Sequence, residues 1–445
     1  MSKHPLSRRE FLVATGTASV VATSTRARTA TVSDKPAILG GTPIRTEPFP
    51  EWPLIKDQDR KNFLESLEEK AWCRLYADTT TEFEEKWAAA LGAKHAIGVV
   101  NGTNALYAAL NALDVGPGDE VIVSPFTFVA TLNAILQQYA LPVFVDSDRA
   151  TQQMATDRLK EAITPDTRCI LPVHLGGNMA NMDPILEAAQ EAGIGVVEDA
   201  CQAHFAEWRK KKAGAVGDIG CFSFQSTKIL PCGEGGAVVT NRADLYDKLH
   251  AFQNNGRDRL KGTREGYLHQ GTNLRMTEFQ GALLLAQLAR LEEQCKHREG
   301  NAAYLTKLLN EIPGVEPAQM YEGCTRNAYY IYMARYDQSQ FSGLSRSGFL
   351  RALAKDGISV GAGYKPLDKE PFLDQILNSR AFRNIYSKQR ISDLKERWNL
   401  PENDKLCEES IFLSQRCLLG SRQDVEQIAQ AVARIQRHAG EISKL

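Results

Sequence analysis

Short apolar strands alternate with helical segments from about residue 81 to residue 199. The strand-like runs are residues 95–100, 120–124, 142–146, 169–174 and 194–199, and helical spacing marks residues 81–91, 104–113, 127–139 and 182–192, with a polar helix expected to end near residue 163. Neighbouring parallel strands need a crossover connection, usually a helix, and their sheet is buried on both faces. The alternation therefore predicts a largely parallel sheet that is covered by helices on both faces.

The rhythm changes after residue 199. Two strands at residues 219–224 and 236–240 follow each other closely, and a long helix is expected over residues 277–299. Beyond it lie a β-rich run at 327–336 and helices at 345–355 and 425–438, whereas residues 368–404 are charged and poorly periodic. We expect a large α/β domain over residues 31–299 and a smaller α+β domain over residues 300–445.

Residues 1–30 form a different kind of sequence. Arg8 and Arg9 stand in Ser-Arg-Arg-Glu-Phe-Leu, and an uncharged run over residues 11–22 follows. That run is shorter than the roughly 20 apolar residues that span a bilayer, so we expect no stable membrane insertion. The pattern is typical of a twin-arginine export signal, which predicts a periplasmic or other extracytoplasmic location. The alternative is a basic tail with an accidental arginine pair, which would leave the protein in the cytoplasm.

Charge and cysteine content narrow the class of partner. The chain has 53 Lys and Arg against 54 Asp and Glu, a formal net charge of −1. A nucleic-acid partner would call for a basic excess or a basic face, so none is expected. The nine cysteines are odd in number and no two have C-x-x-C spacing, so we expect neither a metal site nor a disulfide framework.

Four features fall at predicted strand ends, where ligands bind in open α/β sheets. The Gly102-Thr103 turn precedes a helix, Asp199 closes an apolar strand, Lys228 follows a β-rich run, and Phe128 follows another strand. Taken singly, each feature more often has a structural role. A glycine-threonine turn or an aspartate usually caps the next segment, a lysine is usually a solvated charge, and an aromatic side chain usually packs in the core. Together they match pyridoxal phosphate, which needs a lysine amine, a carboxylate at its pyridinium nitrogen, an anion-binding helix N-terminus and a stacking aromatic.

The chemistry explains these residue types. A carboxylate keeps the pyridine nitrogen protonated, because an adjacent negative charge stabilises the cationic form. The protonated ring withdraws electrons from the substrate carbon, and the released lysine can then move a proton as a base if its pKa is lowered.

The sequence resembles the DegT/StrS family of fold-type-I pyridoxal phosphate aminotransferases, which act on keto-sugars and keto-cyclitols. The matching stretches run in family order over residues 83–291, with weaker similarity in GISVGAGYKPL and in FLSQRCLLGSRQDVEQIAQAV near the C-terminus. They are FEEKWAAALGAKHAIGVVNGTNALYAAL, GDEVIVSPFTFVATLNAI, PVFVDSD, VVEDACQAHFAE, GDIGCFSFQSTKILPCGEGGAVVTN, FQNNGR and GTNLRMTEFQGALLLAQL.

The resemblance implies roles for individual residues. Lys228 corresponds to the lysine that forms the Schiff base and Asp199 to the pyridinium partner, and both would be catalytic. Other cofactor contacts would come from Gly102, Thr103 and Ser223 at the phosphate, Gln202 at the ring hydroxyl and Phe128 at the ring face. Asn254 corresponds to an asparagine that reaches the phosphate in the partner subunit, which implies a homodimer with shared active sites.

The resemblance implies an aminotransferase that moves an amino group from Glu or Gln to a keto-sugar or keto-cyclitol through a Schiff base on Lys228. Two alternatives are a pyridoxal phosphate-dependent sugar dehydratase, in which family members carry His in place of the lysine, and a non-catalytic sensor of cofactor or sugar. Gly176 stands where an aromatic is common, and the segment after Asp368 is atypical, so the acceptor stays open. If export is real, a free keto-sugar or keto-cyclitol is favoured over a nucleotide sugar.

Overall fold

The computed structural model describes residues 34–259, 267 and 269–445. Asp34–Leu445 forms one compact unit. The expected leader, residues 1–30, lies outside the described residues. Within the described part of the chain, no helix is long and apolar enough to cross a bilayer.

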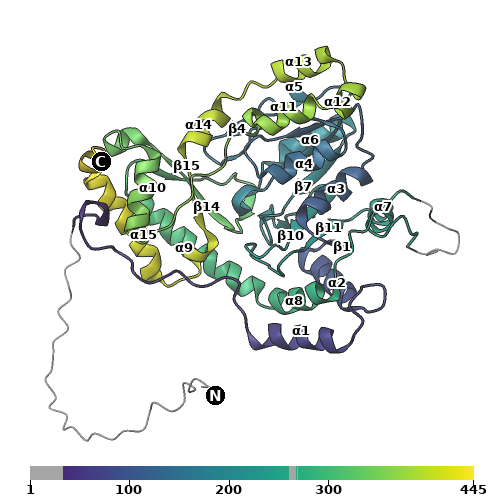
Figure 1. Ribbon diagram of the computed structural model, residues 1–445, viewed down its shortest axis with the longest axis horizontal. Coiled ribbons are helices and arrows are strands. Elements are labelled where there is room, and N and C mark those ends of the chain that lie inside the picture. Colours follow the sequence, from purple (N-terminus) through teal and green to yellow (C-terminus); the bar gives the residue numbers. More distant parts are fainter. Residues whose placement is uncertain (1–33, 260–266, 268) are drawn as a thin grey trace, which may run out of the picture. The chain divides into compact units, whose positions relative to one another are not determined.

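A seven-stranded sheet lies at the centre of this unit, and its strands β1, β11, β10 and β7 are labelled in Figure 1. The full spatial order of the sheet is β1-β11-β10-β7-β6-β2-β3. Its strands are β1 (His95–Val99), β2 (Glu120–Val123), β3 (Leu141–Phe144), β6 (Thr167–Leu171), β7 (Gly195–Asp199), β10 (Ile219–Ser223) and β11 (Gly236–Thr240). All neighbours are parallel except β11, which pairs antiparallel with both β10 and β1. Every residue of β2, β3, β10 and β11 is buried, as a sheet covered on both faces requires. The predicted mostly parallel α/β sheet is confirmed.

Helices pack around this sheet and complete the larger apolar core. They are α1 (Asp57–Glu68), α2 (Thr79–Leu91), α3 (Gly102–Ala112), α4 (Val129–Gln137), α6 (Met182–Ala192), α7 (Ala243–Gln253) and α8 (Glu278–Leu288). α3 contacts β10 and β11, α2 contacts β1, and α1 packs against α8. The contact of α3 with β10 matters most for function, because it brings the helix N-terminus beside the end of β10.

Two predicted helices differ from the structure. The single helix expected over residues 277–299 is wrong: α8 ends at Leu288 and α9 (Leu291–Leu309) begins after a break at Arg290. The Arg290 guanidinium donates to the Leu54 carbonyl at 2.8 Å and to Asp59 at 2.7 Å, so a tertiary contact accompanies the break.

The polar helix expected to end near residue 163 is mostly a hairpin. β4 (Ser147–Asp148) pairs with β5 (Gln153–Met154), and only the short α5 (Leu159–Ala162) is helical. The Asp148 carboxylate accepts hydrogen bonds from the backbone N–H of Thr151 at 2.7 Å and from its hydroxyl. Aspartate competes with a helix in this way because its short side chain bonds to nearby backbone groups.

The C-terminal part builds a second core around an antiparallel sheet in the order β12-β14-β15. Its strands are β12 (Val315–Pro317), β14 (Ile331–Tyr336) and β15 (Ser410–Ser414), and its helices besides α9 are α10 (Arg346–Lys355), α15 (Arg422–Arg437) and α16 (Ala439–Ile442).

A separate small sheet joins β8 (Glu207–Trp208), β9 (Lys211–Lys212) and β13 (Cys324–Arg326). Short 3-10 helices are η1 (Ala37–Leu39), η2 (Leu175–Gly177), η3 (Gln338–Phe341), η4 (Leu367–Lys369) and η5 (Gln415–Leu418). The second core has the expected α+β character, and the domain boundary at residue 299 stays a prediction.

The segment that allowed no prediction is helical: α11 (Pro371–Leu377), α12 (Arg380–Ile385), α13 (Lys388–Glu396) and α14 (Pro401–Glu409). Its buried side chains, such as Leu373, Phe382 and Leu394, join the larger core rather than the C-terminal one. Arg390 and Arg397 pair with the fully buried Glu120 at 2.7 and 2.8 Å. Two cations thus neutralise a carboxylate at the start of β2.

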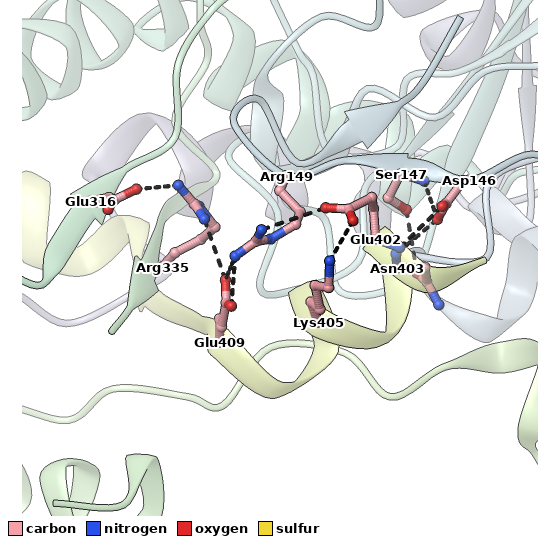
Figure 2. A network of polar contacts seen from close by, with 9 residues as sticks. All are labelled: Asp146, Ser147, Arg149, Glu316, Arg335, Glu402, Asn403, Lys405 and Glu409. Atoms are coloured by element: carbon pink, nitrogen blue, oxygen red, sulfur yellow. Dashed lines mark hydrogen bonds and ion pairs between the residues drawn. The ribbon is translucent and has the colours of Figure 1, made fainter. Parts of the chain in front are cut away.

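Polar contacts hold α14 between the two cores (Figure 2). The Asp146 carboxylate accepts from the backbone N–H of Glu402 and Asn403 at 3.0 and 2.8 Å. Glu409 at the other end of α14 pairs with Arg149 at 2.6 Å and with Arg335 of β14 at 3.3 Å. This network fixes β14 relative to the central sheet, which matters because residues before β14 and after β15 reach the site described below.

Candidate active site

A cavity of about 540 Å³ lies where β7 and β10 end and α3 begins. Seven of the eight residues predicted for the site line it: Gly102, Thr103, Phe128, Asp199, Gln202, Ser223 and Lys228. They come from distant parts of the sequence, and the parallel sheet brings them together because its strands end at one edge.

The first turn of α3 forms one wall of the cavity. Asn101 caps the helix, and its side-chain oxygen accepts from the backbone N–H of Asn104 at 2.9 Å. The N–H groups of Gly102 and Thr103 have no partner within the helix, since the first turn of any helix lacks them. A Cβ at Gly102 would lie 2.7 Å from Ser223 Cβ and 2.9 Å from Cys201 Sγ. Only glycine allows the first turn of α3 to approach Ser223 this closely. The N–H groups of this turn and the Ser223 side chain line the same cavity, and together they suit an anion.

Asp199 forms the floor at the end of β7 and is only 5% exposed. Its Oδ2 accepts from the Thr131 hydroxyl of α4 at 2.8 Å, and its Oδ1 accepts from the Cys201 N–H at 3.2 Å. These two donors leave the carboxylate facing the cavity in a fixed orientation. Sequence reasoning missed Thr131, which carries no signal beyond being one helical turn from Thr127.

The neighbouring Glu198 points to the opposite face of β7, as alternation along a strand requires. Its carboxylate is fully buried and accepts from the N–H groups of Gly214, Val216 and Gly217 at 2.7–2.9 Å. It also pairs with His174 Nε2 at 2.9 Å. Since His174 Nδ1 accepts from the backbone N–H of Ala180, Nε2 carries the proton that is donated to Glu198. This buried set holds the strand that presents Asp199.

Gln202 connects the floor to the C-terminal part of the chain. Its Oε1 accepts from the Gly176 N–H at 2.8 Å, and its Nε2 donates to the Tyr364 hydroxyl at 3.1 Å. Burial raises the pKa of Tyr364 to about 12, so this residue offers a neutral hydroxyl. Gly176 has φ +67°, and a Cβ there would meet Met333 Sδ at 2.7 Å. Met333 of β14 therefore occupies the space beside the position where the resemblance leads one to expect an aromatic.

Lys228 lies in the turn between β10 and β11. Its amine sits 4.3 Å above the centroid of the Tyr330 ring, an arrangement in which the ring face attracts the cation. Among the described residues, no carboxylate forms an ion pair with this amine. Burial, and secondarily the Lys228 charge, lowers the pKa of the nearby His204 to about 3. Tyr330, like Tyr364, was not predicted, because nothing in the sequence links these residues to Lys228.

The two aromatics after β2 differ in environment. Phe126 is buried in a small cluster with Val173 and Met333, whereas Phe128 is 55% exposed and lines the cavity. An exposed ring at a cavity wall is available for stacking, and the contact of Phe128 with a cofactor stays a prediction.

Asn254 does not line the cavity of its own chain. It follows the last residue of α7 as its C-cap and is 7% exposed, and its side-chain oxygen accepts from Arg275 Nη1 at 3.0 Å. Its role toward a partner subunit stays a prediction.

Comparison with known proteins identifies the family. The sequence profile of the DegT/DnrJ/EryC1/StrS aminotransferase family matches residues 53–412. The chain belongs to this family. This aminotransferase is 34% identical over 425 residues to the L-glutamine:2-deoxy-scyllo-inosose aminotransferase of Streptoalloteichus tenebrarius, covering 91% of this chain and 98% of the relative. It is 35% identical to the 3-amino-5-hydroxybenzoate synthase of Amycolatopsis mediterranei, covering 87% and 98%.

Solved structures agree with the fold of the aminotransferase. A crystal structure of 3-amino-5-hydroxybenzoic acid synthase has a TM-score of 0.79 at 32% identity and covers 88% of this chain and 99% of its own. An aminotransferase from Psychrobacter cryohalolentis has a TM-score of 0.77 at 28% identity, covering 86% and 98%. The protein is a fold-type-I aminotransferase that uses pyridoxal phosphate.

The residues of the site fit this cofactor. The glycine-dependent approach of α3 to Ser223 suits a phosphate, and the buried carboxylate of Asp199 suits a pyridinium nitrogen. The Lys228 amine, which borders the same cavity, suits attachment of an aldehyde. Within the described residues, no group of three His, Cys, Asp or Glu side chains could hold a metal ion.

Proposed function

We propose that this aminotransferase transfers the amino group of glutamine or glutamate to the ketone of a sugar or cyclitol, with Lys228 as the catalytic lysine. The observation that carries the proposal is the convergence of Lys228, Asp199 and the Gly102–Thr103 turn on one cavity. The relative from S. tenebrarius, named an L-glutamine:2-deoxy-scyllo-inosose aminotransferase, supports both donor and acceptor.

Each residue has a distinct task in this proposal. The N–H groups of Gly102 and Thr103 and the Ser223 hydroxyl bind the phosphate, and Asp199 stabilises a protonated pyridine nitrogen. When bound, the cofactor withdraws electrons from the carbon that bears the amino group. Lys228 Nζ would hold the cofactor covalently. Once released, it would take the proton from the carbon that bears the amino group and deliver it to the cofactor carbon to which the lysine had been bound. Gln202 orients the ring hydroxyl and Phe128 covers the ring face.

The test is turnover against a substrate panel. The protein loaded with pyridoxal phosphate is incubated with L-glutamine or L-glutamate and with keto-cyclitols, free keto-sugars or nucleotide keto-sugars, and products are identified by mass spectrometry. We expect an aminated free cyclitol or sugar from wild-type protein and none from Lys228→Ala. A cofactor-loaded protein that aminates no member of the panel contradicts the proposal, and a dehydrated product without amination would instead indicate the dehydratase alternative.

The role of Lys228 has its own readout. Borohydride reduction of the loaded protein, followed by peptide mass spectrometry, should place the cofactor mass on Lys228. Label on another lysine would refute the assignment regardless of the substrate.

We also propose that the enzyme is a homodimer in which Asn254 serves the partner's site. Asn254 lies outside the cavity of its own chain, and Trp72 and Tyr76 leave apolar surface exposed. The test mixes two inactive variants, Lys228→Ala and Asn254→Ala. If Asn254 serves the site of the partner subunit, a mixed dimer contains one site with both Lys228 and Asn254 intact, and activity returns. If Asn254 acts within its own chain, every site lacks one of the two residues and no activity returns. Light scattering of the wild-type protein measures the dimer directly.

For location, we propose export through the twin-arginine route, supported by Arg8 and Arg9 before an uncharged run. Such export carries folded proteins, which suits an enzyme loaded with its cofactor, and nucleotide sugars should be scarce outside the cytoplasm. Cell fractionation should find the protein outside the cytoplasm and the variant with Arg8→Lys and Arg9→Lys inside. Wild-type protein found only in the cytoplasm refutes export and removes this argument for a free acceptor.

A further inference from the structure

The turn that carries Lys228 is held by segments that are remote in the sequence. The Trp52 indole donates to the Lys228 carbonyl at 3.0 Å, and the Gln415 amide donates to the Thr227 carbonyl at 2.8 Å. The Thr227 hydroxyl also contacts the Tyr330 hydroxyl at 2.9 Å. Peptide groups are planar, so fixing the carbonyls on both sides of Lys228 fixes the two planes that set the direction of its side chain.

Gln415 is in turn oriented by Arg298 of α9. Both side chains are buried, and Arg298 Nη1 donates to Gln415 Oε1 at 3.2 Å. A guanidinium only donates and a backbone carbonyl only accepts. A side chain that joins Arg298 to the Thr227 carbonyl must therefore both accept and donate, and the Gln415 amide does so.

Arg298 is an unusual group at this depth. It is fully buried, and its other hydrogen bond goes to Cys295 Sγ at 3.3 Å. Among the described residues no carboxylate forms an ion pair with it, and the neighbouring Glu299 pairs with Arg326 instead. Burial lowers the pKa of Arg298. A buried cation without a counter-ion is costly, so its bond to the Gln415 oxygen is strongly favoured and locks the amide with its nitrogen toward Thr227.

The next residue holds the other side of the turn. Arg416 Nε donates to the Pro50 carbonyl at 2.8 Å and Nη2 donates to the Phe49 carbonyl at 3.3 Å. These residues lead directly to Trp52. The start of η5 thus contacts the lysine turn through Gln415 and the segment that carries Trp52 through Arg416.

We propose that Gln415 and Trp52 are positioning residues for Lys228, and that Arg298 acts by orienting Gln415. They hold the peptide planes on both sides of Lys228, so that its amine stands over Tyr330 in the cavity. This inference rests on the role proposed above for Lys228.

The test compares two matched substitutions on η5 and α9. Gln415→Glu keeps an acceptor for Arg298 and adds a counter-ion, but its carboxylate offers no donor to the Thr227 carbonyl. The control is Asn301→Leu. Asn301 is also a buried residue of α9, and its amide donates to the Leu418 carbonyl of η5 at 2.9 Å without contacting the lysine turn.

Three quantities are measured on the cofactor-loaded proteins: the half-time of cofactor release into cofactor-free buffer, the pH midpoint of the visible absorbance band, and Tm. For Gln415→Glu we expect release about ten-fold faster, because a hydrogen bond to the lysine turn is lost and a buried acceptor is left unsatisfied. We also expect a shifted midpoint. Tm should stay close to that of the wild type, because the new carboxylate beside Arg298 offsets the lost hydrogen bond. Asn301→Leu should lower Tm and leave release and midpoint unchanged. Trp52→Phe should shift release and midpoint in the same sense as Gln415→Glu.

The proposal is overturned if Gln415→Glu releases the cofactor at the wild-type rate and keeps the wild-type pH midpoint. It is also overturned if Asn301→Leu changes release and midpoint as much as Gln415→Glu does. That result would show that general loosening of η5 is sufficient to disturb the lysine. Borohydride labelling separates this outcome from a failure of the proposed function. Unlabelled Lys228 in wild-type protein refutes its catalytic role, whereas labelled Lys228 with unchanged release in Gln415→Glu refutes the positioning alone.

Discussion

Gly102 offers a direct test of the phosphate cradle. In Gly102→Ala, the new Cβ would lie 2.7 Å from Ser223 Cβ, 2.9 Å from Cys201 Sγ and 3.2 Å from Ser223 Cα. These separations are shorter than normal contacts, so the first turn of α3 must move away from β10. Alanine is otherwise the better helix former by about 1 kcal/mol, so local propensity predicts the opposite sign.

The size of the change in Kd depends on whether the strain is present in the cofactor-free protein or only in the cofactor-bound protein. Overpacking of this kind typically costs about 1–3 kcal/mol. Without ligand, α3 is free to move by the roughly 0.7 Å that separates 2.7 Å from an ordinary contact of about 3.4 Å, which relieves the strain. A phosphate bound by both the α3 N–H groups and the Ser223 hydroxyl would oppose that shift. The strain then falls on the bound state, and Kd for pyridoxal phosphate rises about 5- to 150-fold.

The assay is equilibrium titration of cofactor-free protein with pyridoxal phosphate, followed by absorbance and intrinsic fluorescence. Gly116→Ala is the control, because a Cβ at Gly116 meets nothing within 4 Å. We expect weaker binding in Gly102→Ala and wild-type binding in Gly116→Ala. If Gly102→Ala lowers Tm but binds the cofactor as tightly as the wild type does, the substitution destabilises the fold without affecting cofactor binding. The proposal that the first turn of α3 and Ser223 bind the phosphate would then be wrong.

Three further predictions concern the scaffold. Replacing Arg390 and Arg397 by Ala should destabilise the protein by about 3–5 kcal/mol, because Glu120 would stay buried without its cations. Adding Glu120→Leu should recover much of this loss in thermal melts, and no recovery would contradict the argument. Burial lowers the pKa of His250 from 6.5 to about 4. The contribution of the neutral His250 to stability is therefore complete above pH 6.5 and is lost as the pH falls toward 4. His250→Gln should make Tm fall less steeply over this pH range, and an unchanged slope would refute the role of His250. Ser421→Ala removes the capping box of α15 and should cost about 1 kcal/mol, measured as a lower Tm; an unchanged Tm would mean that water replaces the cap.

Local sequence patterns were sufficient for the central sheet but not for the connections that depend on tertiary contacts. Apolar runs such as residues 120–124 are short, bounded by turn residues and buried on both faces, so their pattern identifies them as strands. The break at Arg290 and the hairpin at Asp148 escaped prediction, because side chains of these residues bond to backbone or to distant groups. Residues 368–404 were also unpredictable, since their charged side chains include the partners of Glu120, far away in sequence.

The same division runs through the active site. By itself, the sequence predicted three features that line the cavity: Asp199 at a strand end, the Gly102–Thr103 turn after a strand, and Lys228 in the turn beyond β10. It could do so because parallel strands end at one edge and short motifs mark those ends. Only the tertiary structure brought Tyr330, Tyr364 and Gln415 to the site. These contacts join segments more than 100 residues apart, and packing of the second core against the sheet decides them.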